Sequence, residues 1–230
     1  WQRMKIKLKW PLGSLKSGRS QTTDGVIERI NAFYQKSGRA PFKEGITTWI
    51  GLAHMNLVIH SSKSFSILLI GKPGNGKSYL TYLFLQAGWI FGADDWVDLF
   101  VHDGQLIAGP EWRGEREFWY HGLDPMRPKI RLQVIGDDSV FSRVKLLVVL
   151  KVGEGFHVQP QLSDSATISQ LIERHSNTLP LVFQKIAATR LLSHNILIVE
   201  LPRAPAERDY EGLMRLIQRV AEAEGSPGTA

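Results

Sequence analysis

The sequence of 230 residues contains no cysteine. Disulfides and thiolate metal sites are therefore excluded, and a reducing compartment is permitted. Long hydrophobic runs are also absent: the stretch 146–150 is far shorter than the roughly 20 residues of a membrane span, and no signal-peptide pattern opens the chain. We therefore expect a cytoplasmic protein without a membrane span. Because Trp1 stands where Met would begin a complete chain, we expect the sequence to be a piece of a longer one.

Acidic residues are absent from the start of the chain, where the whole excess of positive charge lies. The formal net charge is +6, with 28 basic and 22 acidic residues. Residues 1–23 hold six basic and no acidic side chains, so the remainder carries 22 of each sign. A domain that binds nucleic acid should show a basic face within its fold. We therefore expect no nucleic acid binding by the main part of the chain.

A glycine-rich stretch follows an apolar run at 65–70 and precedes a helical pattern that ends at Gly88. It reads Gly71-Lys72-Pro73-Gly74-Asn75-Gly76-Lys77-Ser78 and fits the pattern G-x-x-x-x-G-K-S. A strand before this pattern and a helix after it are the context in which it binds phosphate. A turn that merely joins a strand to a helix would need neither Lys77 nor Ser78.

We predict that this stretch binds ATP with Mg²⁺. Glycines let successive backbone N–H groups turn inward around an anion, and the helix start near Lys77 adds the positive end of its dipole. Lys77, which we expect to be exposed, then reaches the terminal phosphates, while the Ser78 hydroxyl ligates Mg²⁺. The predicted nucleotide-binding residues are Gly71, Lys72, Pro73, Gly74, Asn75, Gly76, Lys77, Ser78 and Tyr79.

The remaining pattern predicts an α/β domain that begins at residue 48, after an accessory segment at 1–47. Strands are expected around 56–60, 64–70, 89–97, 129–135, 144–151 and 195–201, and helices at 26–34, 78–87, 165–173 and 206–224. A hairpin is expected from 97–100 and 105–108, because Asp103-Gly104 suits a tight turn. The stretch 110–128 is polar, and we predict no regular element there.

From Gly71 to Ser78, and on through Gly88-Trp89-Ile90-Phe91-Gly92-Ala93-Asp94-Asp95, the sequence resembles the catalytic domain of the HPr kinase/phosphorylase family. Glu111-Trp112-Arg113-Gly114 is similar to that family's Glu-x-Arg-Gly signature, and the likeness extends over about 56–201. The resemblance implies a P-loop kinase domain of the HPr kinase and phosphoenolpyruvate carboxykinase-like type, with a mixed central sheet and flanking helices. It is also consistent with a homo-oligomer.

The resemblance implies a role for each matching residue. Lys77 would hold the donor phosphate, Ser78 and Glu111 would bind Mg²⁺, and Asp94 with Asp95 would supply the base for an acceptor hydroxyl. His60 stands about where the family keeps a catalytic histidine, and Arg113 would either clamp a phosphate or pair with Glu115 or Glu117. The family's Arg-Leu-Gly motif has no counterpart in 144–180, and its N-terminal domain has none here either. We therefore expect a kinase acting on a serine-type hydroxyl of a peptide, protein or small molecule.

Other interpretations stay open at this point. A P-loop ATPase would take its second acidic motif from elsewhere, for instance Asp137-Asp138, and a bifunctional kinase/phosphorylase would also run the reverse reaction. A third alternative is a nucleotide-binding module without catalysis. For single residues, Asp94 and Asp95 could cap a helix, Glu111 could be an exposed loop carboxylate, and His60 could be a core or rim residue. The aromatic residues Trp112, Phe118, Trp119 and Tyr120 could line an acceptor pocket or pack in the core.

Overall fold

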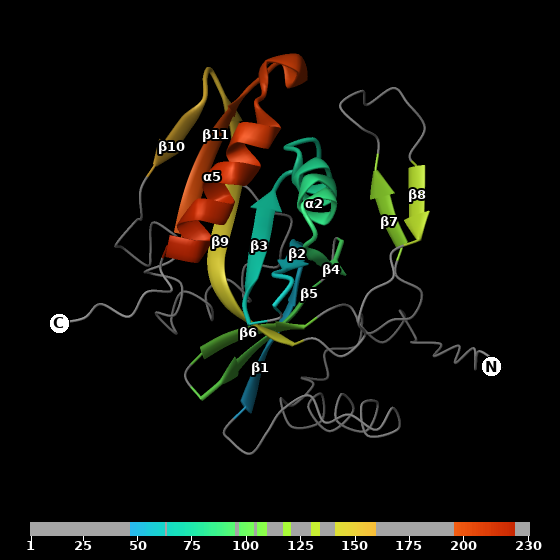
Figure 1. Cartoon of the computed structure of the whole chain (residues 1–230). Helices are drawn as coiled ribbons and strands as arrows, with labels where there is room; N and C mark the ends of the chain where they lie inside the picture. Colours follow the sequence, from blue (N-terminus) through green and yellow to red (C-terminus); the bar gives the residue numbers. More distant parts are fainter. Residues whose placement is uncertain are drawn as a thin grey trace, which may run out of the picture.

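Two helices cover one face of a mixed sheet in the computed structural model (Figure 1). The structure describes residues 47–62, 64–94, 97–103, 105–109, 117–120, 130–133, 141–159 and 196–223, and for the strands at 47–53, 117–120 and 130–133 it describes the backbone. Within these residues the expected α/β class, with a mixed central sheet and flanking helices, is confirmed. Neither described helix is long and apolar enough to cross a membrane. The division at residue 47/48 stays a prediction.

Five largely apolar and buried strands, which we call the central strands, form the main part of the sheet. The strands are β2 (Asn56–Ile59), β3 (Ser66–Gly71), β4 (Ile90–Ala93), β9 (Ser142–Gly153) and β11 (Ile196–Pro202), with β4 at one end of the strand order. The strand β3 pairs parallel with β9, and β9 pairs parallel with β11. The strand β2 runs antiparallel to both β3 and β4. The carboxyl ends of β3, β9 and β11 therefore lie along one edge of the sheet.

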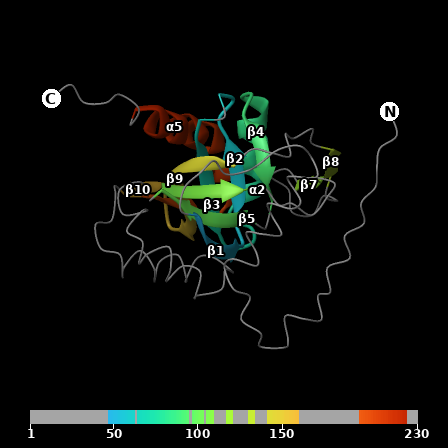
Figure 2. The same ribbon diagram turned by 90° about the horizontal axis from the view of Figure 1, so that it is seen from below.

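The long strand β9 belongs to two parts of the sheet. Its first residues pair antiparallel with β6 (Gln105–Gly109), and its remainder lies between β3 and β11. The strands β1 (Thr47–Ala53), β5 (Val97–His102) and β6 form an antiparallel ribbon that continues from this point. Viewed from below, β1 and α5 lie on opposite sides of β9 and β3 (Figure 2). The result is a layer of helices, a layer of central strands and the β1–β5–β6 ribbon.

The predicted hairpin is confirmed in the β5–β6 pair, where His102 lies opposite Gln105. Asp103 has a φ of 47°, the left-handed conformation that Asp tolerates in a tight turn. The strands expected at 56–60, 64–70 and 195–201 are confirmed as β2, β3 and β11, with ends shifted by at most two residues. Three more are confirmed with other ends: β9 is longer than 144–151, β8 (Ile130–Gln133) is shorter than 129–135, and β4 ends before the two carboxylates.

The helix α2 (Lys77–Gln86) lies where the sequence predicts it, one residue earlier at its start. Gly88, at φ 86°, ends it because glycine adopts the left-handed conformation without strain. The second helix, α5 (Tyr210–Ala223), begins four residues later than predicted. Pro205 lies instead in the short 3₁₀ helix η2 (Pro205–Glu207), and Asp209 caps α5 by accepting the Gly212 N–H at 2.8 Å.

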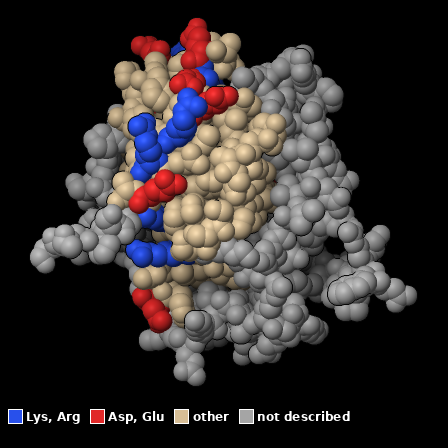
Figure 3. All heavy atoms as spheres, in the orientation of Figure 1, with Lys and Arg blue, Asp and Glu red and all other residues tan. Residues whose placement is uncertain are grey.

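The outer face of α5 carries charges of both signs (Figure 3). Its exposed residues include Glu211, Arg215, Arg219 and Glu222, and Glu211 pairs with Arg215 at 3.6 Å. Its inner face buries Tyr210, Leu213, Ile217 and Ala221. This division of polar and apolar residues at helical spacing explains why the sequence pattern predicted an amphipathic helix.

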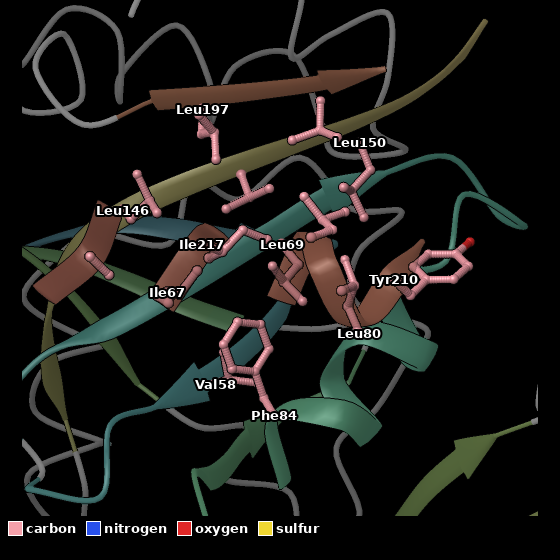
Figure 4. Close-up of a cluster of buried hydrophobic side chains, with 14 of the residues drawn as sticks. Val58, Ile67, Leu69, Leu80, Phe84, Leu146, Leu150, Leu197, Tyr210 and Ile217 are labelled. Atoms are coloured by element: carbon pink, nitrogen blue, oxygen red, sulfur yellow. The ribbon is translucent and has the colours of Figure 1, made fainter. Parts of the chain in front are cut away.

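Two hydrophobic clusters hold the layers together. One cluster joins α2 and α5 to the central strands through side chains such as Leu80, Phe84, Leu69 and Ile217 (Figure 4). The other cluster lies between the central strands and the β5–β6 ribbon and includes Leu68, Val149 and Leu99. Burying each of these side chains stabilises the fold by about 1.5–3 kcal/mol relative to leaving it exposed. The two clusters therefore hold the helices, the central strands and the β5–β6 ribbon in fixed positions around the candidate site.

Some elements were not predicted, and some predictions lie outside the described residues. The strand β7 (Glu117–Tyr120) pairs with β8 in a separate two-stranded sheet, within a stretch for which the sequence predicts no element. The short strand β10 (His157–Gln159), which pairs with β11, was also missed. The accessory segment and the predicted helices at 26–34 and 165–173 lie outside the described residues.

Candidate functional site

The glycine-rich loop, residues 72–76, connects β3 to α2 at the carboxyl edge of the parallel strands. Gly74 has a φ of 82° and Gly76 a φ of 92°, conformations that other residues adopt only with strain. Within the loop, the Asn75 N–H donates to the Lys72 carbonyl at 3.1 Å, which closes a turn. The helix begins directly after Gly76, so the N–H groups of its first turn have no acceptor within the helix and can face an anion.

Close packing holds this loop against the sheet. A Cβ on Gly71 would lie 2.8 Å from the Leu150 carbonyl oxygen, so β3 and β9 leave no room for a larger residue. The buried Asn75 side chain donates from Nδ2 to that same carbonyl at 2.7 Å. The loop is therefore anchored to the neighbouring parallel strand, and its curvature is fixed by the sheet.

The side chain of Lys77 turns back into the loop. It is buried, with 6% of its surface exposed, and its Nζ donates to the carbonyl oxygens of Gly71 at 2.7 Å and of Lys72 at 3.5 Å. The expectation that this lysine is exposed was therefore wrong, because these carbonyls hold the ammonium group within the curve of the loop. A positive charge placed there favours binding of an anion.

A polar network links the start of α2 to the end of β4. The hydroxyl of Ser78 donates to Oδ1 of Asp94 at 3.4 Å, and Nδ2 of the buried Asn56 donates to the same oxygen at 2.7 Å. The amide of Asn56 also donates to the Thr81 hydroxyl at 3.0 Å, which donates to the Lys77 carbonyl at 3.0 Å. Two strands and a helix thus set the position of the Asp94 carboxylate.

The residue types of this network suit a small divalent cation. Mg²⁺ binds oxygen ligands in an octahedral shell that phosphate and water complete, and a hydroxyl and a carboxylate lie side by side at Ser78 and Asp94. Among the described residues, no group of three or more His, Cys, Asp or Glu side chains forms a metal site. The predicted second ligand, Glu111, lies outside the described residues. The Ser78 hydroxyl can therefore supply one oxygen ligand to such a cation, while the Asp94 carboxylate lies beside that hydroxyl.

Aromatic side chains flank the loop on the side of α5. The ring of Tyr79 meets the ring of Tyr210 edge to face, with centroids 4.9 Å apart. Burial raises the pKa of the Tyr79 phenol above its ordinary value, and the nearby Glu211 carboxylate raises it further. Tyr79 is therefore a neutral phenol at physiological pH.

The structure does not bring His60 to this site. His60 follows the last residue of β2, about 13 Å along the strand from Asn56 at 3.3 Å per residue. Its ring stacks on Phe65 at 4.7 Å and contacts Trp89, and its Nε2 lies 4.0 Å from a Glu222 oxygen. We therefore correct the assignment of His60 as a catalytic residue: it belongs to an aromatic rim at the opposite end of β2 and β3.

Three predicted site residues lie outside the described residues: Asp95, Glu111 and Arg113. The alternative acids Asp137 and Asp138 and the aromatic residue Trp112 also lie outside them. The other aromatic residues expected either to line a pocket or to pack in the core, Phe118, Trp119 and Tyr120, lie on β7, whose backbone runs beside α2. The roles expected for all of these residues stay predictions.

Sequence reasoning missed Asn56 and Thr81, which hold Asp94 and the start of α2. The sequence pattern makes Asn56 the first residue of an apolar strand and Thr81 one position of a helix. A polar residue fully buried in such a strand requires hydrogen-bond partners, which was the available signal. The identity of those partners depends on the pairing of β2 with β4, which no local pattern reveals.

No protein-family model matches this sequence, and no curated protein matches it. Among solved structures, the fold is similar to that of the HPr(Ser) kinase/phosphatase from Coxiella burnetii, with a TM-score of 0.43 and 15% sequence identity. The similarity covers 76% of this chain and 93% of that one. At this distance we take no function from the likeness, and the proposal below rests on the residues of the site.

Proposed function

We propose that this protein is an ATP- and Mg²⁺-dependent kinase that transfers the terminal phosphoryl group to a hydroxyl, of the serine type, on a peptide, protein or small molecule. The observation that carries the proposal is the contact between Ser78 and Asp94, 3.4 Å apart, directly beside a glycine-rich loop that encloses the Lys77 ammonium group. Donor-binding groups and a candidate base thus lie within one site, as phosphoryl transfer requires.

The glycine-rich loop is the part that would hold the donor. Its backbone N–H groups and the start of α2 bind phosphate oxygens, and Lys77 neutralises negative charge on the terminal phosphates. Mg²⁺, held by Ser78 and, in the predicted set, by Glu111, neutralises further charge on the donor. These groups act by position and charge and undergo no covalent change.

Asp94, with Asp95, is the proposed base. Its carboxylate takes the proton of the acceptor hydroxyl as the acceptor oxygen forms a bond to the terminal phosphorus of ATP. The bond from that phosphorus to the bridging oxygen breaks, and ADP leaves with the electron pair. The hydrogen bonds from Asn56 and Ser78 to Oδ1 orient the carboxylate for this step.

The strand beside the loop supports a kinase over a motor- or switch-type ATPase. Such ATPases place an acidic residue at the end of a buried strand next to the phosphate-binding strand. Here the parallel neighbour of β3 is β9, where Leu150 lies opposite Gly71 and the next residue is Lys151. The ammonium group of Lys151 pairs with Glu200 at 2.6 Å. The strand β8, which precedes the alternative acids Asp137 and Asp138, pairs with β7 outside the nine-stranded sheet.

The test follows labelled ATP in the presence and absence of acceptors. Wild type, Asp94→Asn and Asp95→Asn are incubated with seryl peptides, HPr and free hydroxylated metabolites. We expect label to appear in one acceptor class with wild type, and transfer to fall by roughly 10²- to 10⁴-fold in Asp94→Asn, the contribution typical of general-base catalysis. The affinity for ATP should stay unchanged, because Asn retains the Oδ1 acceptor that Asn56 contacts.

Without an acceptor, the wild type should hydrolyse ATP slowly, since the site does not hold water in line. Brisk hydrolysis that needs no acceptor and survives both substitutions would instead assign the protein to the ATPases. The essential carboxylate would then be sought at Asp137 or Asp138. Transfer of phosphate from a phosphorylated acceptor back to inorganic phosphate would identify a bifunctional kinase/phosphorylase.

A further inference from the structure

The guanidinium group of Arg208 lies against the glycine-rich loop, although its sequence position predicts no site. Arg208 stands between η2 and α5, more than 130 positions after the loop. Its Nη1 donates to the Gly74 carbonyl at 3.1 Å and to the Tyr210 hydroxyl at 3.0 Å. Its Nε donates to the Pro202 carbonyl at 2.6 Å, and its Nη2 to the Arg203 carbonyl at 3.0 Å. Four hydrogen bonds therefore fix the side chain between the end of β11 and the loop.

The charge of Arg208 has no acidic partner among the residues that the structure describes. Its acceptors are three carbonyl oxygens and one hydroxyl, all of them uncharged. Three acidic residues lie near it in the sequence. Glu207 is exposed at the end of η2, Asp209 accepts the Gly212 N–H, and Glu211 on α5 pairs with Arg215. Because no described carboxylate forms an ion pair with it, the guanidinium contributes a positive potential next to the loop.

Tyr210 makes this arrangement rigid. Its side chain is buried, with 4% of its surface exposed, and its ring covers Gly76 so closely that a Cβ there would overlap the phenol. The same ring meets Tyr79 on α2. Arg208 and Tyr210 therefore hold both left-handed glycines of the loop from one side, one through a hydrogen bond and the other through packing.

We propose that Arg208 is a positioning residue that makes the site selective for highly charged phosphate ligands, an inference that rests on the proposed function. By holding the Gly74 carbonyl outward, Arg208 keeps the loop N–H groups available to the anion. The positive charge of Arg208 favours ligands in proportion to the negative charge they carry. A triphosphate therefore gains more from Arg208 than a diphosphate, and an uncharged nucleoside gains nothing.

The experiment measures dissociation constants of Mg-ATP, Mg-ADP and adenosine for wild type, Arg208→Gln, Arg208→Lys and the control Arg219→Gln. Arg219 is an exposed arginine of α5 outside the site. Removing a charged hydrogen-bonding group should weaken ATP binding roughly tenfold. We expect a smaller loss for ADP, no change for adenosine, and wild-type values for Arg219→Gln. The affinity of Arg208→Lys for Mg-ATP should lie between those of wild type and Arg208→Gln. Lysine keeps the positive charge but lacks the several N–H donors of the planar guanidinium group.

A loss of equal size for ATP, ADP and adenosine would show that Arg208 only supports packing, and unchanged ATP affinity in Arg208→Gln would also overturn the proposal. If circular dichroism shows that Arg208→Gln does not fold, the dissociation constants of Arg208→Lys and Tyr210→Phe test the proposal instead. Tyr210→Phe removes one acceptor but keeps the ring on Gly76, so it should weaken ATP more than adenosine. Wild-type affinity in both would overturn the inference. A wild type that binds no nucleotide would instead refute the proposed function itself.

Discussion

Gly74 and Gly76 share a left-handed backbone but differ in their surroundings. A Cβ on Gly74 would meet nothing within 4 Å, whereas one on Gly76 would overlap the ring of Tyr210. Gly88, at the end of α2, resembles Gly74 in having both a positive φ and open space. Backbone conformation therefore requires glycine at all three positions, and side-chain packing adds a second requirement at Gly76 alone.

This difference predicts the order of stability among three alanine variants. Gly74→Ala and Gly88→Ala should each lose about 1–2 kcal/mol of unfolding free energy, the cost of a left-handed residue that carries a Cβ. Gly76→Ala should lose more, because the Tyr210 ring must also move. Urea denaturation of the three variants measures these free energies. Equal losses at Gly76 and Gly88 would mean that Tyr210 does not pack on the loop.

Lys77 contributes to stability as well as to the proposed chemistry, because its ammonium group satisfies two loop carbonyls. Lys77→Met keeps the aliphatic stem but leaves those carbonyls unpaired, so we expect a loss of roughly 1–3 kcal/mol in urea denaturation. Lys72→Met is the matched control, since Lys72 belongs to the same loop and is exposed. A Lys77→Met variant as stable as wild type would contradict the buried position of the amine.

At the level of elements, apolar runs predicted the central strands, and helical spacing predicted both described helices. These patterns succeed because strands buried on both faces have continuous apolar runs, whereas α5, buried on one face, has apolar residues at helical spacing. The strand β7 was missed because the sequence prediction treated 110–128 as one polar stretch. Its Phe118, Trp119 and Tyr120 are in fact residue types that favour a strand, and β7 pairs with the next strand, β8. The predicted start of α5 at residue 206 is too early, because the chain first forms the 3₁₀ helix η2 and the α-helix begins only after Asp209.

The site was predictable where its residues are contiguous and unpredictable where strands bring them together. Gly71 to Ser78 form a single strand–loop–helix unit, so spacing alone indicated their arrangement. The contact of Asn56 with Asp94 depends on strand pairing, and Arg208 reaches Gly74 from the other end of the chain. His60 was misplaced for the same reason, since its position along the sequence does not tell at which end of the sheet it lies.

The ion pair between β9 and β11 predicts a pH effect on stability. The hydrogen bond from Lys151, aided by the Lys151 charge, lowers the pKa of the Glu200 carboxyl below its ordinary value of about 4.5. A carboxyl whose pKa is lower in the folded chain than in the unfolded chain stabilises the fold at pH values above its unfolded-state pKa. This stabilisation is lost as the pH falls through the pKa that the carboxyl has in the folded state. We therefore expect the stability of wild type and Glu200→Gln to differ most above about pH 5 and to converge in acid.

Thermal denaturation between pH 7 and pH 3 measures this convergence. Glu207→Gln is the control, because Glu207 is an exposed residue of η2 and lies outside the sheet. Its denaturation profile should run parallel to that of wild type. A constant difference between wild type and Glu200→Gln at every pH would show that the carboxylate charge does not stabilise the β9–β11 pair.

At the scale of the whole molecule, the layers determine where a ligand can bind. The carboxyl ends of β3, β9 and β11 meet at one edge, and crevices at such edges are where open α/β sheets bind ligands. The helices α2 and α5 pack on the same face of these strands and bring Tyr79, Tyr210 and Arg208 to the loop. Binding at this edge would therefore stabilise both helices together with the sheet.

This arrangement predicts that Mg-ATP raises the melting temperature of the whole chain in one transition. A ligand at 100 times its dissociation constant stabilises the folded state by about 2.7 kcal/mol. For a chain of 230 residues this corresponds to a rise of roughly 5–10 °C. Lys77→Met should abolish the shift because the donor phosphates lose their cation, whereas Asp94→Asn should retain it because it leaves the loop unchanged. Differential scanning calorimetry, with Mg²⁺ alone and adenosine as controls, measures the shift, and an equal rise in Lys77→Met would place nucleotide binding outside the glycine-rich loop.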